Sequence, residues 1–362
     1  MQPSTSTSNS TPVMVPASNR PTIYSSIVVV MIAFATLLVM SCGSSTTDKV
    51  ETNLDSLPPE LAELTKAIDA QPTAAGLYNK RAIWYLEHES PDKALSDIGK
   101  AIELEPKVPA YYRTMSDVYF AMGKPQRSRD ALNKAIEINV DDTASYLKLA
   151  ELEFYFKEYK NTFDFLDKAL QLDPQNAKAY FIRGMAYKEM GDTAKAVRAL
   201  QVAVDYDQDY YHAYMQLGLL YSVKHNPLAV DYFNNALNLN PQSVETYYAL
   251  GMYYQENEEY NKAIEAYTTL LKIDPKFKYA HFNLGYIHLV YLQVYDVAIK
   301  HFTDAINVDK NYAEAWYNRG YSYELRGDVM NARKDYQQAV MIKPNYQRAV
   351  EGLNRLDKLI NK

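Results

Sequence analysis

The chain has 362 residues, of which 48% are hydrophobic, and a formal net charge of −6 at pH 7. This mildly acidic composition excludes the basic surface with which proteins bind nucleic acid or anionic lipid headgroups. The single cysteine excludes a disulfide framework and a cysteine-rich zinc site.

Residues 1–41 are predicted to be a signal peptide. Residues 27–40 (IVVVMIAFATLLVM) contain Thr36 as their only polar side chain. A membrane-spanning helix needs about 20 apolar residues, whereas the apolar part of a secretory signal needs about 7–15. The segment VMSC (39–42) resembles the lipobox of bacterial lipoproteins, in which a small residue directly precedes a cysteine. The resemblance implies that Cys42 carries diacylglycerol, that the chain is cut before it, and that the new N-terminus is acylated.

Two features differ from the lipobox pattern. Met40 is larger than the usual residue, and the segment before the apolar run is long and carries only Arg20. Translation from Met14 would shorten that segment. An uncleaved anchor over residues 23–40 is the alternative, and a thiol placed there by chance is another. Residues 42–58 are predicted to be a flexible tether. Gly43 rather than Asp follows the cysteine, which favours the outer membrane.

Residues 75–345 repeat with a period of about 34 residues. Each unit has a small residue in the middle of its first predicted helix: Ala82, Ser116, Ala150, Gly184, Gly218, Gly251, Gly285 and Gly320. The residue four places earlier, the framework aromatic, is a Tyr or Trp in seven units: Tyr78, Tyr112, Tyr146, Tyr180, Tyr214, Tyr247 and Trp316. His281 takes this position in the seventh unit. Prolines close five units: Pro106, Pro174, Pro241, Pro275 and Pro344.

This pattern resembles the tetratricopeptide repeat family. The resemblance implies an all-α fold, a right-handed α-solenoid of about eight helix-turn-helix repeats. The small residue would let the paired helix approach closely, and Gly123, Gly191 and Gly327 would end first helices as C-terminal caps. A half-repeat helix over residues 59–74 precedes the array. Residues 346–362 are predicted to form a capping helix that covers the last repeat.

No motif for catalysis accompanies the repeats, so we do not expect an enzyme. The acidic cluster at residues 256–259 is interpreted as a solvated turn. His281 and His288 are seven residues apart and could share a helical face, as a metal-binding pair would. Both, however, occupy framework positions where other units have tyrosine. We therefore expect packing rings there, and no metal, cofactor or small-molecule substrate.

The concave groove is where the resemblance places a partner. The residues after the framework aromatic and after the small residue should face this groove. In units four to eight they are apolar or aromatic: Phe181, Met185, Met215, Leu219, Tyr248, Met252, Phe282, Tyr286, Tyr317 and Tyr321. In the first three units they are more polar: Asn79, Ile83, Arg113, Asp117, Leu147 and Glu151. We expect a hydrophobic partner segment to dock along repeats four to eight, although neighbouring helices would bury part of these side chains. A groove that clamps a carboxylate would need paired cations, which these positions lack.

The sequence thus predicts a non-catalytic protein-protein interaction scaffold that is lipid-anchored in a bacterial cell envelope. Its partners would be proteins or peptide segments, in secretion, outer-membrane assembly or peptidoglycan turnover, by family analogy alone. A peptide-binding chaperone or carrier for unfolded envelope proteins is the alternative. No nucleic-acid partner is expected.

Overall fold

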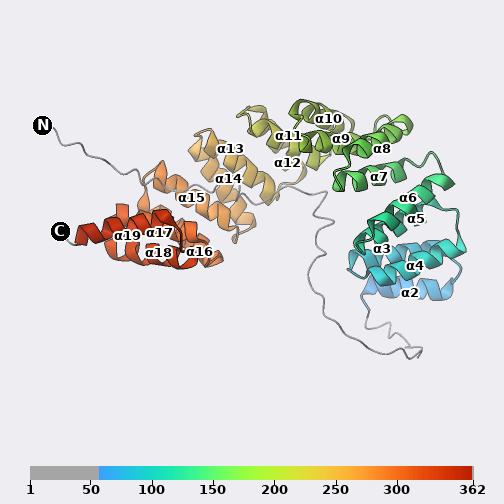
Figure 1. Ribbon diagram of the computed structural model, residues 1–362, viewed down its shortest axis with the longest axis horizontal. Helices are drawn as coiled ribbons and strands as arrows, with labels where there is room; N and C mark the ends of the chain where they lie inside the picture. The colour runs from blue at the N-terminus through green and yellow to red at the C-terminus, as the bar shows by residue number, and fades with distance from the viewer. Residues whose placement is uncertain (1–56, 361–362) are drawn as a thin grey trace. The chain divides into compact units, whose positions relative to one another are not determined.

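A computed structural model describes residues 57–360, which form 18 α-helices and no strand (Figure 1). The predicted signal peptide, Cys42 and nearly all of the predicted tether lie outside the described residues. The helices are α2 Pro59–Ala70, α3 Ala75–Glu87, α4 Pro91–Leu104, α5 Pro109–Ala121, α6 Pro125–Ile138, α7 Thr143–Tyr155, α8 Tyr159–Leu172, α9 Ala177–Glu189, α10 Thr193–Tyr206, α11 Tyr211–Ser222, α12 Leu228–Leu239, α13 Val244–Glu256, α14 Tyr260–Ile273, α15 Lys278–Val290, α16 Tyr295–Val308, α17 Ala313–Leu325, α18 Val329–Ile342 and α19 Gln347–Ile360.

The predicted all-α solenoid is confirmed, because each odd-numbered helix from α3 to α17 begins one 34-residue unit. The described chain forms two compact bodies, residues 57–213 and residues 214–360. In the N-terminal body α2 packs on α3, and α3/α4, α5/α6, α7/α8 and α9/α10 form pairs. In the C-terminal body the pairs are α13/α14, α15/α16 and α17/α18, and α19 packs on α18. Within residues 57–360 no helix has both the length and the apolar character needed to span a membrane.

The turn between the two helices of a unit has the same hydrogen-bond pattern in seven of the eight units. One residue of each turn has a positive φ: Glu89, Gly123, Lys157, Gly191, His225, Glu258, Gln293 and Gly327. In the second unit the Lys124 amide donates to the Tyr119 carbonyl at 2.8 Å, and the Gly123 amide donates to the Phe120 carbonyl at 2.9 Å. These two bonds define a Schellman cap. The predicted glycine caps are therefore confirmed, and four other units adopt the same cap without glycine. The seventh unit differs, because the Val294 amide donates to the His288 carbonyl at 2.8 Å.

The mid-helix glycines allow the paired helix to approach closely, as the sequence predicts. A Cβ on Gly218 would lie 2.5 Å from the Phe233 ring, and one on Gly251 would lie 2.5 Å from the Tyr267 ring. Neither ring is exposed to solvent. Such distances are far below van der Waals contact, so the second helix can present a ring here only because the first helix has glycine.

The C-terminal helix α19 covers the last unit with an apolar face. Ala349 and Leu356 are fully buried against α17 and α18. Gly352, which the sequence analysis did not single out, lies where a Cβ would be 2.6 Å from the Tyr336 ring. The Tyr336 ring thus lies between two glycines, Gly320 of α17 and Gly352 of α19, and α19 takes the place of the next first helix.

Candidate functional site: the inner surface of the first helices

The first helices of successive units stack side by side. In the N-terminal body α3 contacts α5, α5 contacts α7 and α7 contacts α9. In the C-terminal body α15 contacts α17, and α17 contacts α19. We call the residue after each framework aromatic the inner-row residue. The inner row comprises Asn79, Arg113, Leu147, Phe181, Met215, Tyr248, Phe282 and Tyr317.

Inner-row aromatic rings are covered by the next unit. The residue just before the following first helix packs against each ring. The centroid distances are 5.0 Å for Phe181 and Tyr210, 5.2 Å for Tyr248 and Phe277, 5.1 Å for Phe282 and Tyr312, and 5.4 Å for Tyr317 and Tyr346. Rings at these separations attract each other in addition to the area that they bury. The inner row therefore joins consecutive units, a role that the sequence analysis did not assign to it.

Because the next unit covers these rings, the predicted partner-binding residues have little solvent-accessible surface. Seven of the ten are buried: Phe181, Met215, Tyr248, Met252, Phe282, Tyr286 and Tyr317. The remaining three are half-buried: Met185, Leu219 and Tyr321. Burial raises the pKa of Tyr286 and of Tyr317 to about 12, so both phenols are neutral at physiological pH. Partner binding by this set stays a prediction, and its accessible part is small.

The inner surface of the N-terminal body is charged, in agreement with its more polar sequence. Three ion pairs, which we call the charged ladder, join successive first helices. They are Arg113 with Asp142 at 2.6 Å, Lys148 with Asp117 at 2.6 Å, and Lys178 with Glu151 at 2.8 Å. Asp142 stands just before α7, so it covers Arg113 as the aromatic residues cover their inner-row rings. The position next to the inner-row residue is thus taken by a charged side chain in one unit and by an aromatic ring in others.

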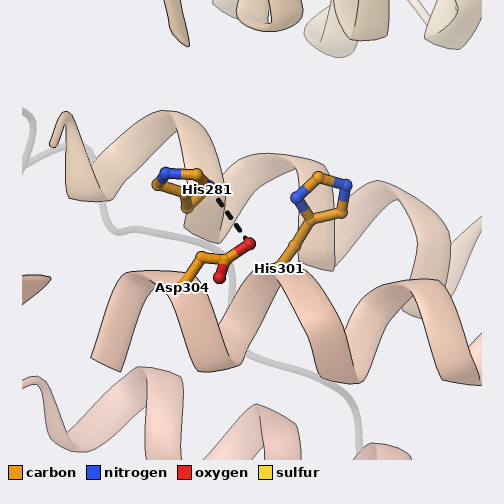
Figure 2. Close-up of side chains that lie close together, drawn as sticks. All are labelled: His281, His301 and Asp304. Carbon is orange, nitrogen blue, oxygen red and sulfur yellow. Dashed lines mark ion pairs between the residues drawn. The ribbon is translucent and has the colours of Figure 1, made fainter. Parts of the chain in front are cut away.

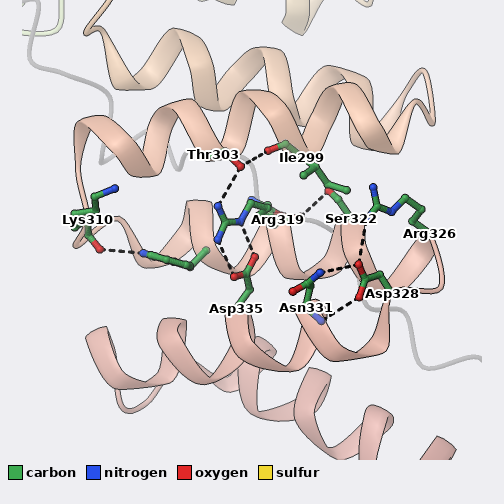
Figure 3. A network of polar contacts seen from close by, with 11 residues as sticks. Ile299, Thr303, Lys310, Arg319, Ser322, Arg326, Asp328, Asn331 and Asp335 are labelled. Atoms are coloured by element: carbon green, nitrogen blue, oxygen red, sulfur yellow. Dashed lines mark hydrogen bonds and ion pairs between the residues drawn. The ribbon is translucent and has the colours of Figure 1, made fainter.

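Arginine networks join units at both ends of the array. Arg319 of α17 donates to both carboxylate oxygens of Asp335 at 2.7 and 2.8 Å, and to the Thr303 hydroxyl at 3.0 Å (Figure 3). Arg81 makes the same two bonds to Asp97 at 2.6 and 2.8 Å. Burial raises the pKa of Asp335, and the Arg319 guanidinium opposes that rise. These networks connect three consecutive helices and contain no activated nucleophile.

One group of side chains has the composition of a metal site. His281 of α15 lies near His301 and Asp304 of α16 (Figure 2). The sequence suggests His281 and His288 as a pair. In the structure the two histidines that lie near the Asp304 carboxylate are His281 and His301. Instead the His288 ring stacks on His301, with centroids 5.8 Å apart.

Four segments of the chain match models described as "Tetratricopeptide repeat", at residues 109–142, 165–198, 244–277 and 313–346. Anaphase-promoting complex subunit 3 of Schizosaccharomyces pombe is 26% identical over 106 residues. That alignment covers 29% of this chain and only 16% of the curated relative.

Two solved structures align with parts of the chain. The crystal structure of MamA protein is 22% identical, covers 48% of this chain and 96% of its own, and has a TM-score of 0.44. A tetratricopeptide repeat protein from Parabacteroides merdae is 16% identical, covers 68% of this chain and 98% of its own, and has a TM-score of 0.47. The four matches show that the chain contains tetratricopeptide repeats, and the regular helix pairs recur with the same period.

Proposed function

We propose that the protein is a non-catalytic docking scaffold, lipid-anchored in a bacterial cell envelope. The observation that carries this proposal is the stacking of first helices into one inner surface per body. Tetratricopeptide repeats bind peptide or protein partners, and the buried polar networks described above serve packing. The partners would act in secretion, outer-membrane assembly or peptidoglycan turnover, a list that rests on family analogy.

The two bodies suit different partner chemistry. The charged ladder leaves Asp117 and Lys178 about half exposed at the inner surface of the N-terminal body. In the C-terminal body, Leu219 and Tyr321 are half-buried, whereas the other predicted groove residues are buried. An apolar segment, helical or extended, is the occupant that these residues favour there.

Capture of partners from the native envelope tests the docking surface. Met252 and Tyr286 are unsuitable probes because each is only 7% exposed, and a charge there would disturb packing. The double variant Leu219→Glu, Tyr321→Glu places two charges on half-buried positions instead. The matched control, Met330→Glu with Met341→Glu, places the same charges on α18 at side chains that are 66% and 74% exposed.

Cross-linked affinity purification with mass spectrometry should recover stoichiometric partners with the wild type and with the control. The inner-surface variant should lose most of this capture while its helicity and melting temperature stay close to wild type. Equal capture by the two variants would reject the docking surface. A broad set of unrelated apolar peptides that bind saturably and weakly would favour the chaperone alternative.

The anchor is tested separately at Cys42. Wild-type protein should be labelled by palmitate and should fractionate with membranes, whereas Cys42→Ser should be unlabelled and soluble. If neither form is labelled and Cys42→Ser still fractionates with membranes, an uncleaved anchor replaces the lipoprotein. Neither result affects the docking test.

A further inference from the structure

The seventh unit places three potential metal ligands around one point. His281 lies on α15, and His301 and Asp304 lie three residues apart on α16, so they share a helical face. One ligand atom from each residue lies within 4.8 Å of the other two. The His281 Nδ1 atom is 4.0 Å from an Asp304 carboxylate oxygen, which is too long for a hydrogen bond (Figure 2).

The structural role of His281 uses only one of its two nitrogens. In other units the framework aromatic donates to the carbonyl six residues earlier, as Tyr112 does to Pro106 at 3.0 Å and Trp316 does to Lys310 at 2.9 Å. His281 Nε2 lies 3.0 Å from the Pro275 carbonyl oxygen. Since a carbonyl can only accept, Nε2 carries a proton, and in the neutral ring Nδ1 is then the nitrogen with the lone pair.

That lone pair is buried. Within the described residues His281 Nδ1 has no hydrogen-bond partner, and neither does the buried Nδ1 of His301. A metal-binding histidine commonly donates its other N–H to a backbone carbonyl, which fixes the tautomer and aims the free nitrogen. His281 has this arrangement. A tyrosine at this position would satisfy the same carbonyl but would offer no second nitrogen.

The second helix supplies the other two ligands. The buried Nδ1 of His301 has no hydrogen-bond partner within the described residues, so no protein group competes with a metal ion for it. Asp304 adds a negative charge, and its side chain is 37% exposed, which leaves a path from solvent.

We propose that His281, His301 and Asp304 bind one divalent transition-metal ion of the Zn²⁺ type. Two imidazoles and a carboxylate are ligands that Zn²⁺ accepts at about 2.0–2.2 Å, and a water molecule would complete four-coordination. Side-chain rotation would have to bring the three atoms, now within 4.8 Å of one another, closer together to form such bonds. Bound metal would join α15 to α16, so it would stabilise the seventh unit whether or not a partner docks. This replaces the expectation that His281 serves packing alone.

The test uses the full-length chain with Cys42→Ser, so that the only thiol cannot bind metal. Equilibrium dialysis against Zn²⁺ alone, followed by elemental analysis, should give one equivalent per chain. Zn²⁺ should also raise the melting temperature, because it binds only the folded state. Co²⁺ in place of Zn²⁺ should give the visible absorption of a four-coordinate site.

Asp304→Asn is the main variant, because it keeps the shape of a partly exposed side chain. It and His301→Ala should each weaken Zn²⁺ binding by about 100-fold or more. His288→Phe is the matched control: it removes the neighbouring buried histidine and should leave Zn²⁺ stoichiometry and affinity unchanged. Wild-type binding no tighter than that of Asp304→Asn, or equal loss in His288→Phe, would overturn the proposal.

Discussion

Gly251→Ala should destabilise the protein although alanine is the better helix former. A new Cβ would lie 2.5 Å from Cε1 and 2.7 Å from Cδ1 of Tyr267. The ring cannot swing away cheaply. It is fully buried, and its hydroxyl both donates to Gln255 at 3.2 Å and accepts from Asn283 at 3.0 Å. The substitution therefore has to displace backbone or break this network.

Two opposing effects determine how much Gly251→Ala changes the free energy of unfolding. Alanine gains about 1 kcal/mol of intrinsic helix propensity over glycine. Overpacking a dense core costs about 1–3 kcal/mol, and the pinned ring places this site toward the upper end. We expect a net loss of about 1–2 kcal/mol. Gly99→Ala in α4 is the matched control, because a Cβ there meets no atom within 4 Å and only the propensity gain remains.

Urea unfolding combined with hydrogen exchange of α13 and α14 measures the effect, since a repeat array can unfold locally. Gly99→Ala should stabilise its own unit. The double variant Gly251→Ala, Tyr267→Leu should show favourable coupling, because the third unit already has Ala150 and Leu166 at these two positions in one buried cluster. If Gly251→Ala stabilises as much as Gly99→Ala does, close helix approach is not the reason for glycine.

Three further predictions concern turns and ion pairs. Glu258 has φ 63°, so Glu258→Gly should stabilise the sixth cap by about 0.5–1 kcal/mol in urea unfolding. Asp335→Ala should cost about 3 kcal/mol because it leaves Arg319 unpaired, and Arg319→Met with Asp335→Leu should recover most of that loss. A hydrogen bond from Lys278 lowers the pKa of Asp309. This pair should therefore stabilise the fold above the ordinary Asp pKa of about 3.9 and lose that effect as pH falls through the lower folded pKa. Lys278→Met should flatten acid unfolding measured by circular dichroism over this range.

The sequence predicts the role of residues that recur at a fixed spacing on one helix. The small residues and the glycine caps recur with the period, so their roles follow from local geometry. The covering residues Tyr210, Phe277, Tyr312 and Tyr346 also recur, each 29 or 30 residues after its inner-row ring. Their significance depends on knowing that the end of one unit lies over the first helix before it, which is a tertiary contact.

The histidine cluster escapes sequence analysis for a different reason. His281 stands at a framework position, and it draws attention there as a replacement for tyrosine. His301 and Asp304 lie on the second helix. At the positions that correspond to them, no other unit has histidine and aspartate, respectively. A search for residues that recur with the repeat period therefore does not find His301 and Asp304. Only the pairing of α15 with α16 brings residues 20 and 23 positions apart to one point.

The two sets of predicted groove residues have different roles. Inner-row residues pack against the next unit, whether through a ring pair such as Phe282 with Tyr312 or through an ion pair such as Arg113 with Asp142. Their chemistry can therefore change between units while the stacking of first helices is kept. The residue after the small residue is more often accessible: Ile83 is 40% exposed, and Tyr321 is half-buried. Substitution of the first set should thus alter stability before it alters binding. Recognition of a partner should depend on the second set, which includes Asp117 and Glu151 of the charged ladder.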